Sequence, residues 1–195
     1  MDEPRKLADI FDRSATLKKR VAAEHAGTML AMVGAIADAI AAGGRIFFCG
    51  NGGSAADAQH LATELLIRLR GGVERPSWGA LALTLDAAAL SAGGNDYGFD
   101  MVFARPLSGL GRRGDVLVGI TTSGRSPNVL RALEVAGTMG ITRLGFLGGL
   151  GMPAAGLCEH AIVVPSSETA RVQESHITIG HAILELVEDR LTARG

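Results

Sequence analysis

The sequence lacks paired cysteines, a strong net charge and an apolar run long enough to cross a membrane. Its 195 residues include only two cysteines, Cys49 and Cys158. Their separation matches neither a disulfide framework nor a zinc knuckle, so we expect both thiols to be reduced and buried. The formal net charge of −1 provides no electrostatic basis for binding nucleic acid or a membrane surface. A small neutral or anionic ligand is the expected partner.

The amino terminus also lacks the features of a secretion signal. Its first residues, MDEPRKLADIFDR, carry acids where a signal peptide has basic residues followed by an apolar core. No uncharged apolar run reaches the length of a bilayer. These absences predict a cytoplasmic protein. The length and the hydrophobic content of 47% favour one α/β domain over residues 1–195.

Apolar spacing predicts alternating helices and strands. Residues 6–42 have apolar stripes typical of two helices, and we expect residues 1–43 to serve in oligomer packing. The final stretch, Thr169–Thr192, is apolar around much of its circumference, which also favours an oligomer. Short apolar runs typical of buried parallel strands occupy residues 46–49, 80–85, 116–121, 143–147 and 161–164.

These segments predict a three-layer α/β sandwich. Its five-stranded parallel sheet would be of the flavodoxin-like kind, with helices on both faces and extra N-terminal helices. In such folds ligands bind beyond the carboxyl ends of the strands. Two polar loops follow predicted strands and therefore lie at that edge.

The first loop lies within residues 45–70, which have the pattern of a strand, a glycine-rich turn and a helix. Glycines in residues 50–53 permit a tight turn, and Ser54 is positioned to cap the following helix, whose free N–H groups would face an anion. The pattern Gly50-x-Gly52-x-x-Ala55 also fits a relaxed dinucleotide fingerprint. The nearest acidic candidate for ribose binding, Asp86, lies too far along the chain for that alternative.

The second loop has the sequence TTSGRSPN, over residues 121–128. Its hydroxyl groups crowd around the predicted start of a helix, with Ser126 as N-cap and Pro127 in the first turn. Free N–H groups, the positive end of the helix dipole and hydroxyl donors together suit a phosphate monoester. The alternative is that these hydroxyls only cap the helix.

Two histidines, a glutamate and a glutamine on predicted helices are candidate metal ligands. His60 and Glu64 are four residues apart, so they share one helix face. Gln173 and His181 lie on the final helix, and convergence with the first pair would create a nitrogen and oxygen site suited to zinc. Glutamine is an uncommon zinc ligand. The alternative for His181, which lies between isoleucines, is a buried core histidine.

Two further polar positions have both a functional and a structural interpretation. Asn95 and Asp96 lie in a predicted tight loop, where they can hydrogen-bond sugar hydroxyls or serve only the turn. Arg68 can neutralise a bound anion or be an ordinary exposed helix residue.

Four motifs, in this order, are CGNGGSAADAQH, AGGNDYGFD, TTSGRSPN and RVQESHITIGH. Together they resemble the bacterial phosphoheptose isomerases of the sugar-isomerase (SIS) fold, over nearly the whole chain. The resemblance implies interconversion of D-sedoheptulose 7-phosphate and D-glycero-D-manno-heptose 7-phosphate through an enediol, for heptose biosynthesis. It also implies a homotetramer with one zinc ion per subunit and active sites near subunit interfaces.

The resemblance assigns roles residue by residue. It makes Glu64 the base and His181 the acid of proton transfer. The implied zinc ligands are His60, Glu64, Gln173 and His181. The implied substrate contacts are Asn51, Gly52, Gly53, Ser54, Glu64, Arg68, Asn95, Asp96, Thr121, Thr122, Ser123, Ser126 and Gln173.

Two departures and one rival accompany this resemblance. Ala170 stands where some family members have an acidic residue, which removes one expected sugar contact, and Thr121 replaces a frequent serine. The rival is a non-catalytic SIS tetramer that acts as an adaptor for the replication initiator or as a phosphosugar sensor. The presence of both Glu64 and His181 favours the enzyme.

Overall fold

The computed structural model describes residues 2–84 and 86–193 and contains one five-stranded parallel sheet. The strands are β1 (Ile46–Gly50), β2 (Ala80–Ala82), β3 (Val116–Thr121), β4 (Thr142–Leu147) and β5 (His160–Val163). Their order, β2-β1-β3-β4-β5, is that of a flavodoxin-like sheet and confirms the predicted fold class. The predicted strand at residues 80–85 is too long, since β2 ends at Ala82; Leu85 lies outside the described residues.

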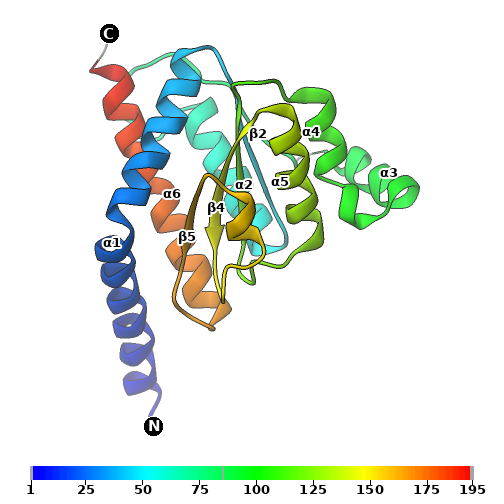
Figure 1. The fold of residues 1–195 in the computed structure, drawn as a ribbon. Coiled ribbons are helices and arrows are strands. Elements are labelled where there is room, and N and C mark those ends of the chain that lie inside the picture. Colours follow the sequence, from blue (N-terminus) through cyan, green and yellow to red (C-terminus); the bar gives the residue numbers. More distant parts are fainter. Residues whose placement is uncertain (1, 85, 194–195) are drawn as a thin grey trace.

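Helices cover both faces of this sheet (Figure 1). They are α1 (Glu3–Ala41), α2 (Gly53–Leu66), α3 (Ala87–Tyr97), α4 (Ala104–Leu110), α5 (Pro127–Met139) and α6 (Thr169–Thr192), with short 3-10 helices at Phe99–Met101 and Ala154–Leu157. Phe48 packs in a core with residues of α1, α2 and α6, whereas Phe47 packs against α4 and α5. Successive strand residues point to opposite faces, so each face has its own core.

The N-terminal segment forms one helix and not the predicted pair. Helix α1 is 39 residues long, with Asp2 as N-cap accepting a bond from the Arg5 N–H and Pro4 in the first turn, where proline is tolerated. Its interior has no proline, and its two glycines, Gly27 and Gly34, do not end it, because each glycine costs a helix only about 1 kcal/mol. The prediction of two helices over residues 6–42 is therefore wrong.

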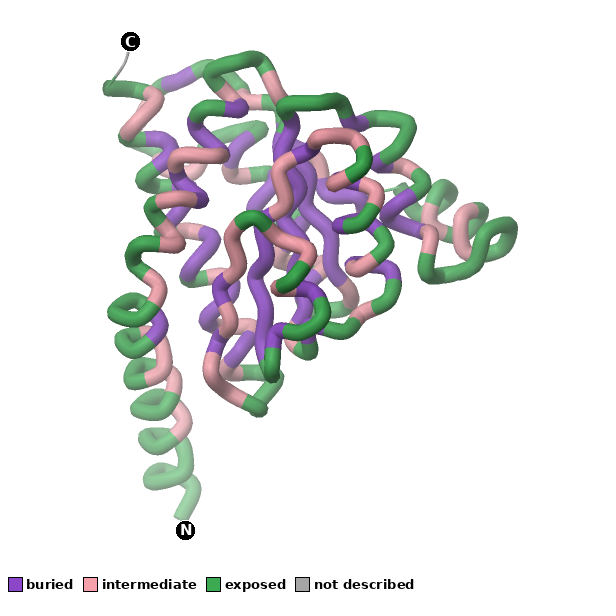
Figure 2. Tube along the Cα trace, in the orientation of Figure 1, coloured by how far each residue is buried: buried purple, intermediate pink, exposed green. Residues whose placement is uncertain are grey.

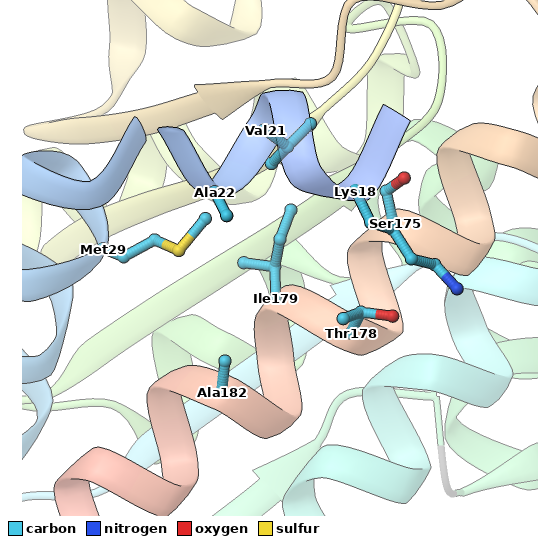
Figure 3. Close-up of a pocket in the computed structure, with 8 residues that line it drawn as sticks. All are labelled: Lys18, Val21, Ala22, Met29, Ser175, Thr178, Ile179 and Ala182. Carbon is cyan, nitrogen blue, oxygen red and sulfur yellow. The ribbon is translucent and has the colours of Figure 1, made fainter. Parts of the chain in front are cut away.

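Only the second half of α1 packs closely on the domain. Its buried residues begin at Val21, and the first turns project away from the sheet with most of their surface exposed (Figure 2). Two large apolar side chains on this projection, Leu7 and Phe11, are 58% and 68% exposed. Between α1 and α6 lies an apolar hollow of about 80 Å³, into which Met29 and Ile179 point (Figure 3). These surfaces leave apolar groups in contact with water.

Two sequence expectations concern the membrane and the cysteines. Among the described helices, none combines the length and the apolar character that crossing a membrane requires. Both cysteines are free thiols. Cys49 is buried in β1, as predicted, whereas Cys158 is only half-buried, so the prediction of burial is wrong for Cys158. Burial raises the pKa of each thiol to about 12, which keeps both in the unreactive protonated form.

Candidate active site

The first glycine-rich loop begins helix α2 at the carboxyl end of β1. Gly52 is the N-cap and has a φ of 56°, a left-handed conformation that glycine adopts without a Cβ clash. Ser54 is buried inside the first turn, and its N–H bonds the Asn51 carbonyl at 3.0 Å. The prediction that Ser54 caps the helix is wrong, because the left-handed glycine starts the helix earlier.

The second loop, between β3 and α5, clusters its hydroxyl groups. The Thr121 hydroxyl lies 2.9 Å from the Ser126 hydroxyl and 3.3 Å from that of Ser123. Ser126 is the N-cap of α5 by position, yet its side chain makes no capping bond. The alternative in which this hydroxyl only caps the helix is therefore wrong for Ser126.

An open hollow of about 350 Å³ borders the second loop. One side is formed by Thr122, Ser123 and Arg125. The other side comes from the segment after β5, with Ser166, Ser167 and Thr169. The sequence analysis missed this second set of hydroxyls; its signal is the Ser-Ser-Glu-Thr run directly after a predicted strand, at the same edge of the sheet.

A pair of amides joins the two loops. The Asn51 side-chain N–H₂ donates to the Asn128 amide oxygen at 2.8 Å, and the Asn128 N–H₂ donates back to Asn51 at 2.8 Å. Asn128 is 2% exposed, and its oxygen also accepts the N–H of Val129 at 3.0 Å. Asn51 was predicted to contact substrate, and its amide here connects the start of α2 to the start of α5.

The candidate metal ligands of α2 and α6 meet in space. Nε2 of His60 lies 2.7 Å from Nε2 of His181 and 3.2 Å from Oε1 of Glu64. The ligand atoms of the three residues all lie within 4.8 Å of one another, the one such His, Cys, Asp and Glu group among the described residues. His60 is exposed and the other two are half-buried, so the group is reachable from solvent. The alternative of a buried core histidine is wrong for His181.

This donor set fits a zinc ion. Zinc takes histidine nitrogens and carboxylate oxygens at about 2.0–2.2 Å in a tetrahedral arrangement, which puts neighbouring donor atoms about 3.3 Å apart. The separation of 3.2 Å is close to that spacing, and that of 2.7 Å is shorter. A cation would take the place of the hydrogen that lies between two ring nitrogens at such a short distance.

Asp57 is a residue that the sequence analysis missed. It precedes His60 by one helical turn, a spacing that places both on one face of α2. Its Oδ2 is buried and accepts no hydrogen bond from the described residues. Burial raises the pKa of its carboxyl, and the nearby His60 and His181 oppose that shift by attraction. The Asp57 carboxyl therefore lies beside the histidine pair.

Two further residues of α6, Gln173 and His176, lie in different surroundings. The Gln173 amide rests against the start of α2, where a Cβ on Gly53 would lie 2.4 Å from its Nε2. His176 is fully buried, and its Nε2 bonds the Leu147 carbonyl at 3.1 Å. Burial lowers the pKa of His176 to about 4, so this ring is a neutral part of the core.

Three predicted substrate contacts have partners outside the group of His60, Glu64 and His181. Asn95 and Asp96 belong to the last turn of α3 and not to a tight loop, and they hydrogen-bond each other at 2.7 Å. Helix α3 lies on the opposite side of the molecule from α6 (Figure 1). Arg68 follows the end of α2, is exposed and faces Glu74 at 3.5 Å.

One domain model and several known proteins match this chain over most of its length. Residues 10–148 match the SIS domain model. A phosphoheptose isomerase from Pelodictyon phaeoclathratiforme is 52% identical over 186 residues, which cover 95% of this chain and 88% of that protein.

Two solved structures have the same architecture. The phosphoheptose isomerase of Neisseria gonorrhoeae superposes with a TM-score of 0.89 at 37% identity and covers 96% of this chain and 100% of its own. The structure of a phosphoheptose isomerase from Francisella tularensis has a TM-score of 0.91 at 33% identity, with 97% and 100% coverage. The similarity therefore extends over the sheet, both loops and the helices of the metal group.

Proposed function

The chain belongs to the SIS-domain family and, within it, to the phosphoheptose isomerases, and we propose that it converts D-sedoheptulose 7-phosphate to D-glycero-D-manno-heptose 7-phosphate for heptose biosynthesis. The observation that carries this proposal is the meeting of His60, Glu64 and His181. Aldose–ketose isomerisation needs one group that takes a proton from carbon and one that supplies a proton to oxygen. A carboxylate and an imidazole side by side meet both needs.

In the proposed reaction Glu64 removes the proton from the carbon next to the substrate carbonyl. The electrons of the broken C–H bond form the double bond of an enediol, while the carbonyl oxygen takes a proton from His181. Glu64 then returns its proton to the former carbonyl carbon. The hydroxyl on the carbon that first lost its proton gives its own proton to His181, and its oxygen becomes the new carbonyl. At the end of the reaction Glu64 and His181 have the same protonation states as at its start. The 16% exposure of the Glu64 side chain limits proton exchange with bulk water.

We propose that one zinc ion per subunit is held by His60, Glu64, Gln173 and His181. Bound zinc would supply a Lewis acid that polarises oxygens of the substrate. The nitrogen and oxygen donor set supports zinc. Gln173 is a proposed ligand through its amide oxygen. A carboxylate held tightly by zinc is a weaker base, so Glu64 acts as base through an oxygen that is free of the metal.

The phosphate group is proposed to bind between the two loops. Hydroxyl donors and two helix N-termini suit a dianion at this edge of the sheet. The Asn51–Asn128 amide pair supports this by joining the two loops. The proposed phosphate and sugar contacts here are Asn51, Gly52, Gly53, Ser54, Thr121, Thr122, Ser123 and Ser126.

We further propose a cytoplasmic homotetramer of single-domain subunits over residues 1–195. The exposed apolar side chains of α1, Leu7 and Phe11, support burial against a second copy, since large apolar groups on a projecting helix favour association. Asn95 and Asp96 lie apart from the cluster within one chain, so we propose that they, together with Arg68, reach substrate near a subunit interface. No nucleic acid or membrane partner is proposed.

The decisive experiment measures turnover of sedoheptulose 7-phosphate by the purified protein, with and without a chelator, and follows the aldose product by NMR. Glu64→Gln and His181→Ala are the variants. We expect product from the wild type, loss in both variants, and a loss with chelator that added zinc restores. Phosphosugar binding without turnover, after metal is restored, would contradict the enzyme and favour a sensor or adaptor.

A further inference from the structure

A buried arginine closes the end of the helix that carries Glu64. The last carbonyls of an α-helix have no partner within the helix, and α2 has no basic residue in its last turn. Arg75 supplies donors from outside the helix. Its Nη2 donates to the Glu64 carbonyl at 2.6 Å and its Nη1 to the Leu65 carbonyl at 3.0 Å. The guanidinium therefore holds the main chain of Glu64 itself.

The same guanidinium reaches the helix that carries His181. Its Nε donates to Oε1 of Glu188 at 2.9 Å, and both side chains are 1% exposed. Glu188 lies two turns beyond His181 on α6. The Trp78 ring covers the guanidinium, with the Arg75 Cζ 3.9 Å from the ring centroid. Arg75 is thus bonded to both helices of the metal group.

We propose that Arg75, with Glu188, is a positioning residue that sets Glu64 against His181 and thereby sets metal affinity and the rate of proton transfer. This inference rests on the proposed function. A planar guanidinium with several fixed donors defines one geometry for its partners, and lysine cannot reproduce it. Groups behind metal ligands commonly change metal affinity or activity about 10- to 100-fold when they are replaced.

Arg70 provides a matched control. It bonds the other oxygen of the same carboxylate, with its Nε 2.6 Å from Oε2 of Glu188, and it also pairs with Asp189. Among the described residues, the hydrogen bonds and ion pairs of its side chain go to carboxylates of α6 and not to α2. Arg70 therefore shares the network of Glu188 without holding Glu64.

The test compares four proteins: wild type, Arg75→Lys, Arg70→Met, and the double variant Arg75→Met with Glu188→Met. The double variant leaves no unpaired buried charge of this pair, and apolar replacement of a buried ion pair is commonly tolerated. Near-UV circular dichroism checks folding. Two readouts follow: the affinity and visible absorption of bound Co²⁺, and kcat and KM for sedoheptulose 7-phosphate.

We expect the double variant to bind Co²⁺ about 10- to 100-fold more weakly, with altered absorption, and to lose kcat more than it raises KM. Arg75→Lys should recover part of this loss, and Arg70→Met should keep both properties. Unchanged Co²⁺ binding and kcat in a folded double variant would overturn the inference, as would equal losses in Arg70→Met.

The two readouts separate this inference from the proposed function. A wild type that binds Co²⁺ but lacks isomerase activity fails the proposed function, and Co²⁺ affinity still decides the role of Arg75. If the wild type converts sedoheptulose 7-phosphate without binding Co²⁺, the kcat values of the variants decide the role of Arg75. A wild type that neither binds Co²⁺ nor isomerises the substrate would overturn both the proposed function and the inference about Arg75.

Discussion

Gly180 of α6 lies directly against the side chain of Leu61 of α2. A Cβ on Gly180 would lie 2.6 Å from both terminal methyl groups of Leu61, which is fully buried. These residues are the immediate neighbours of His181 and His60 in the sequence. The missing side chain at Gly180 therefore allows the two helices to approach closely enough for the histidine rings to meet.

The first prediction follows from this contact. Gly180→Ala should separate α2 and α6, lower metal affinity and reduce kcat about tenfold or more, because misplacing catalytic groups by about 1 Å can cost about 100-fold in rate. Overpacking should also cost about 1–3 kcal/mol of unfolding free energy. Co²⁺ titration, steady-state kinetics and urea unfolding measure these effects.

Gly27→Ala is the matched control for that experiment. Gly27 lies within α1, and a Cβ added there would have no heavy atom within 4 Å. Alanine there should raise the unfolding free energy by about 0.5–1 kcal/mol and leave metal affinity unchanged. Wild-type metal affinity in Gly180→Ala would show that close packing at Gly180 does not position the histidines.

A second prediction concerns the amide pair of Asn51 and Asn128. Asn51→Ala leaves the buried amide of Asn128 without its partner, so we expect a loss of about 1–3 kcal/mol of unfolding free energy. The double variant Asn51→Ala with Asn128→Ala should lose less than the sum of the single changes, with a coupling of about 0.5–3 kcal/mol. Urea unfolding of all four proteins gives this coupling, and strictly additive losses would contradict it.

A third prediction separates ligand binding from helix capping at Ser126. The Ser126 side chain makes no capping bond, and the Thr121 hydroxyl that it contacts also lies 3.3 Å from the Ser123 hydroxyl. Ser126→Ala should therefore lower the melting temperature only slightly. It should raise KM for the phosphosugar about tenfold, since a hydrogen bond to a charged group contributes about 1.5–3 kcal/mol.

Thr138→Ala, near the other end of α5, is the control for Ser126. Its hydroxyl bonds the Val135 carbonyl within the same helix. Kinetics of this variant should match the wild type. A clear drop in the melting temperature of Ser126→Ala, with KM unchanged, would instead assign that hydroxyl to the fold.

A fourth prediction concerns pH and the buried ring of His176. Burial lowers its pKa from 6.5 to about 4, so between these values the unfolded chain binds a proton that the folded chain does not. The unfolding free energy should therefore fall as pH falls from about 6.5 to about 4, by about 3 kcal/mol from this group. Urea unfolding across this pH range measures the slope.

His176→Gln isolates that contribution from other titrating groups. Glutamine keeps a donor for the Leu147 carbonyl that Nε2 of His176 bonds, and it does not titrate. The variant should show a shallower decline of unfolding free energy with falling pH than the wild type. Parallel pH profiles for the two proteins would contradict the assignment.

Much of the fold was predictable from the sequence because its signals are local. The short apolar runs marked all five strands, and continuous apolar character indicated strands buried on both faces. Helix α6 matched its predicted bounds, Thr169–Thr192. Where the prediction failed, the deciding interactions were also local but weakly signalled: Gly52 rather than Ser54 begins α2, and one continuous helix replaces the predicted N-terminal pair.

The candidate site was predictable only in part. The four-residue spacing of His60 and Glu64 determined that they share a helix face, because helix geometry alone sets that relation. Helix geometry does not determine where His181 lies relative to them. The role of Arg75 is equally invisible in the sequence, since its partners lie on two other segments of the chain.

The sequence by itself therefore determined the five strands, their order along the chain, the final helix and the polar loops at the ends of the strands. Periodicity, turn residues and the rules of parallel sheets act over short stretches of chain. Tertiary structure alone decided which distant side chains meet: the close packing of Gly180 on Leu61, the amide pair between two loops, and the burial of His176 but not His181. Such contacts between distant residues depend on how whole helices pack on the sheet, and this packing is set only when the core is assembled.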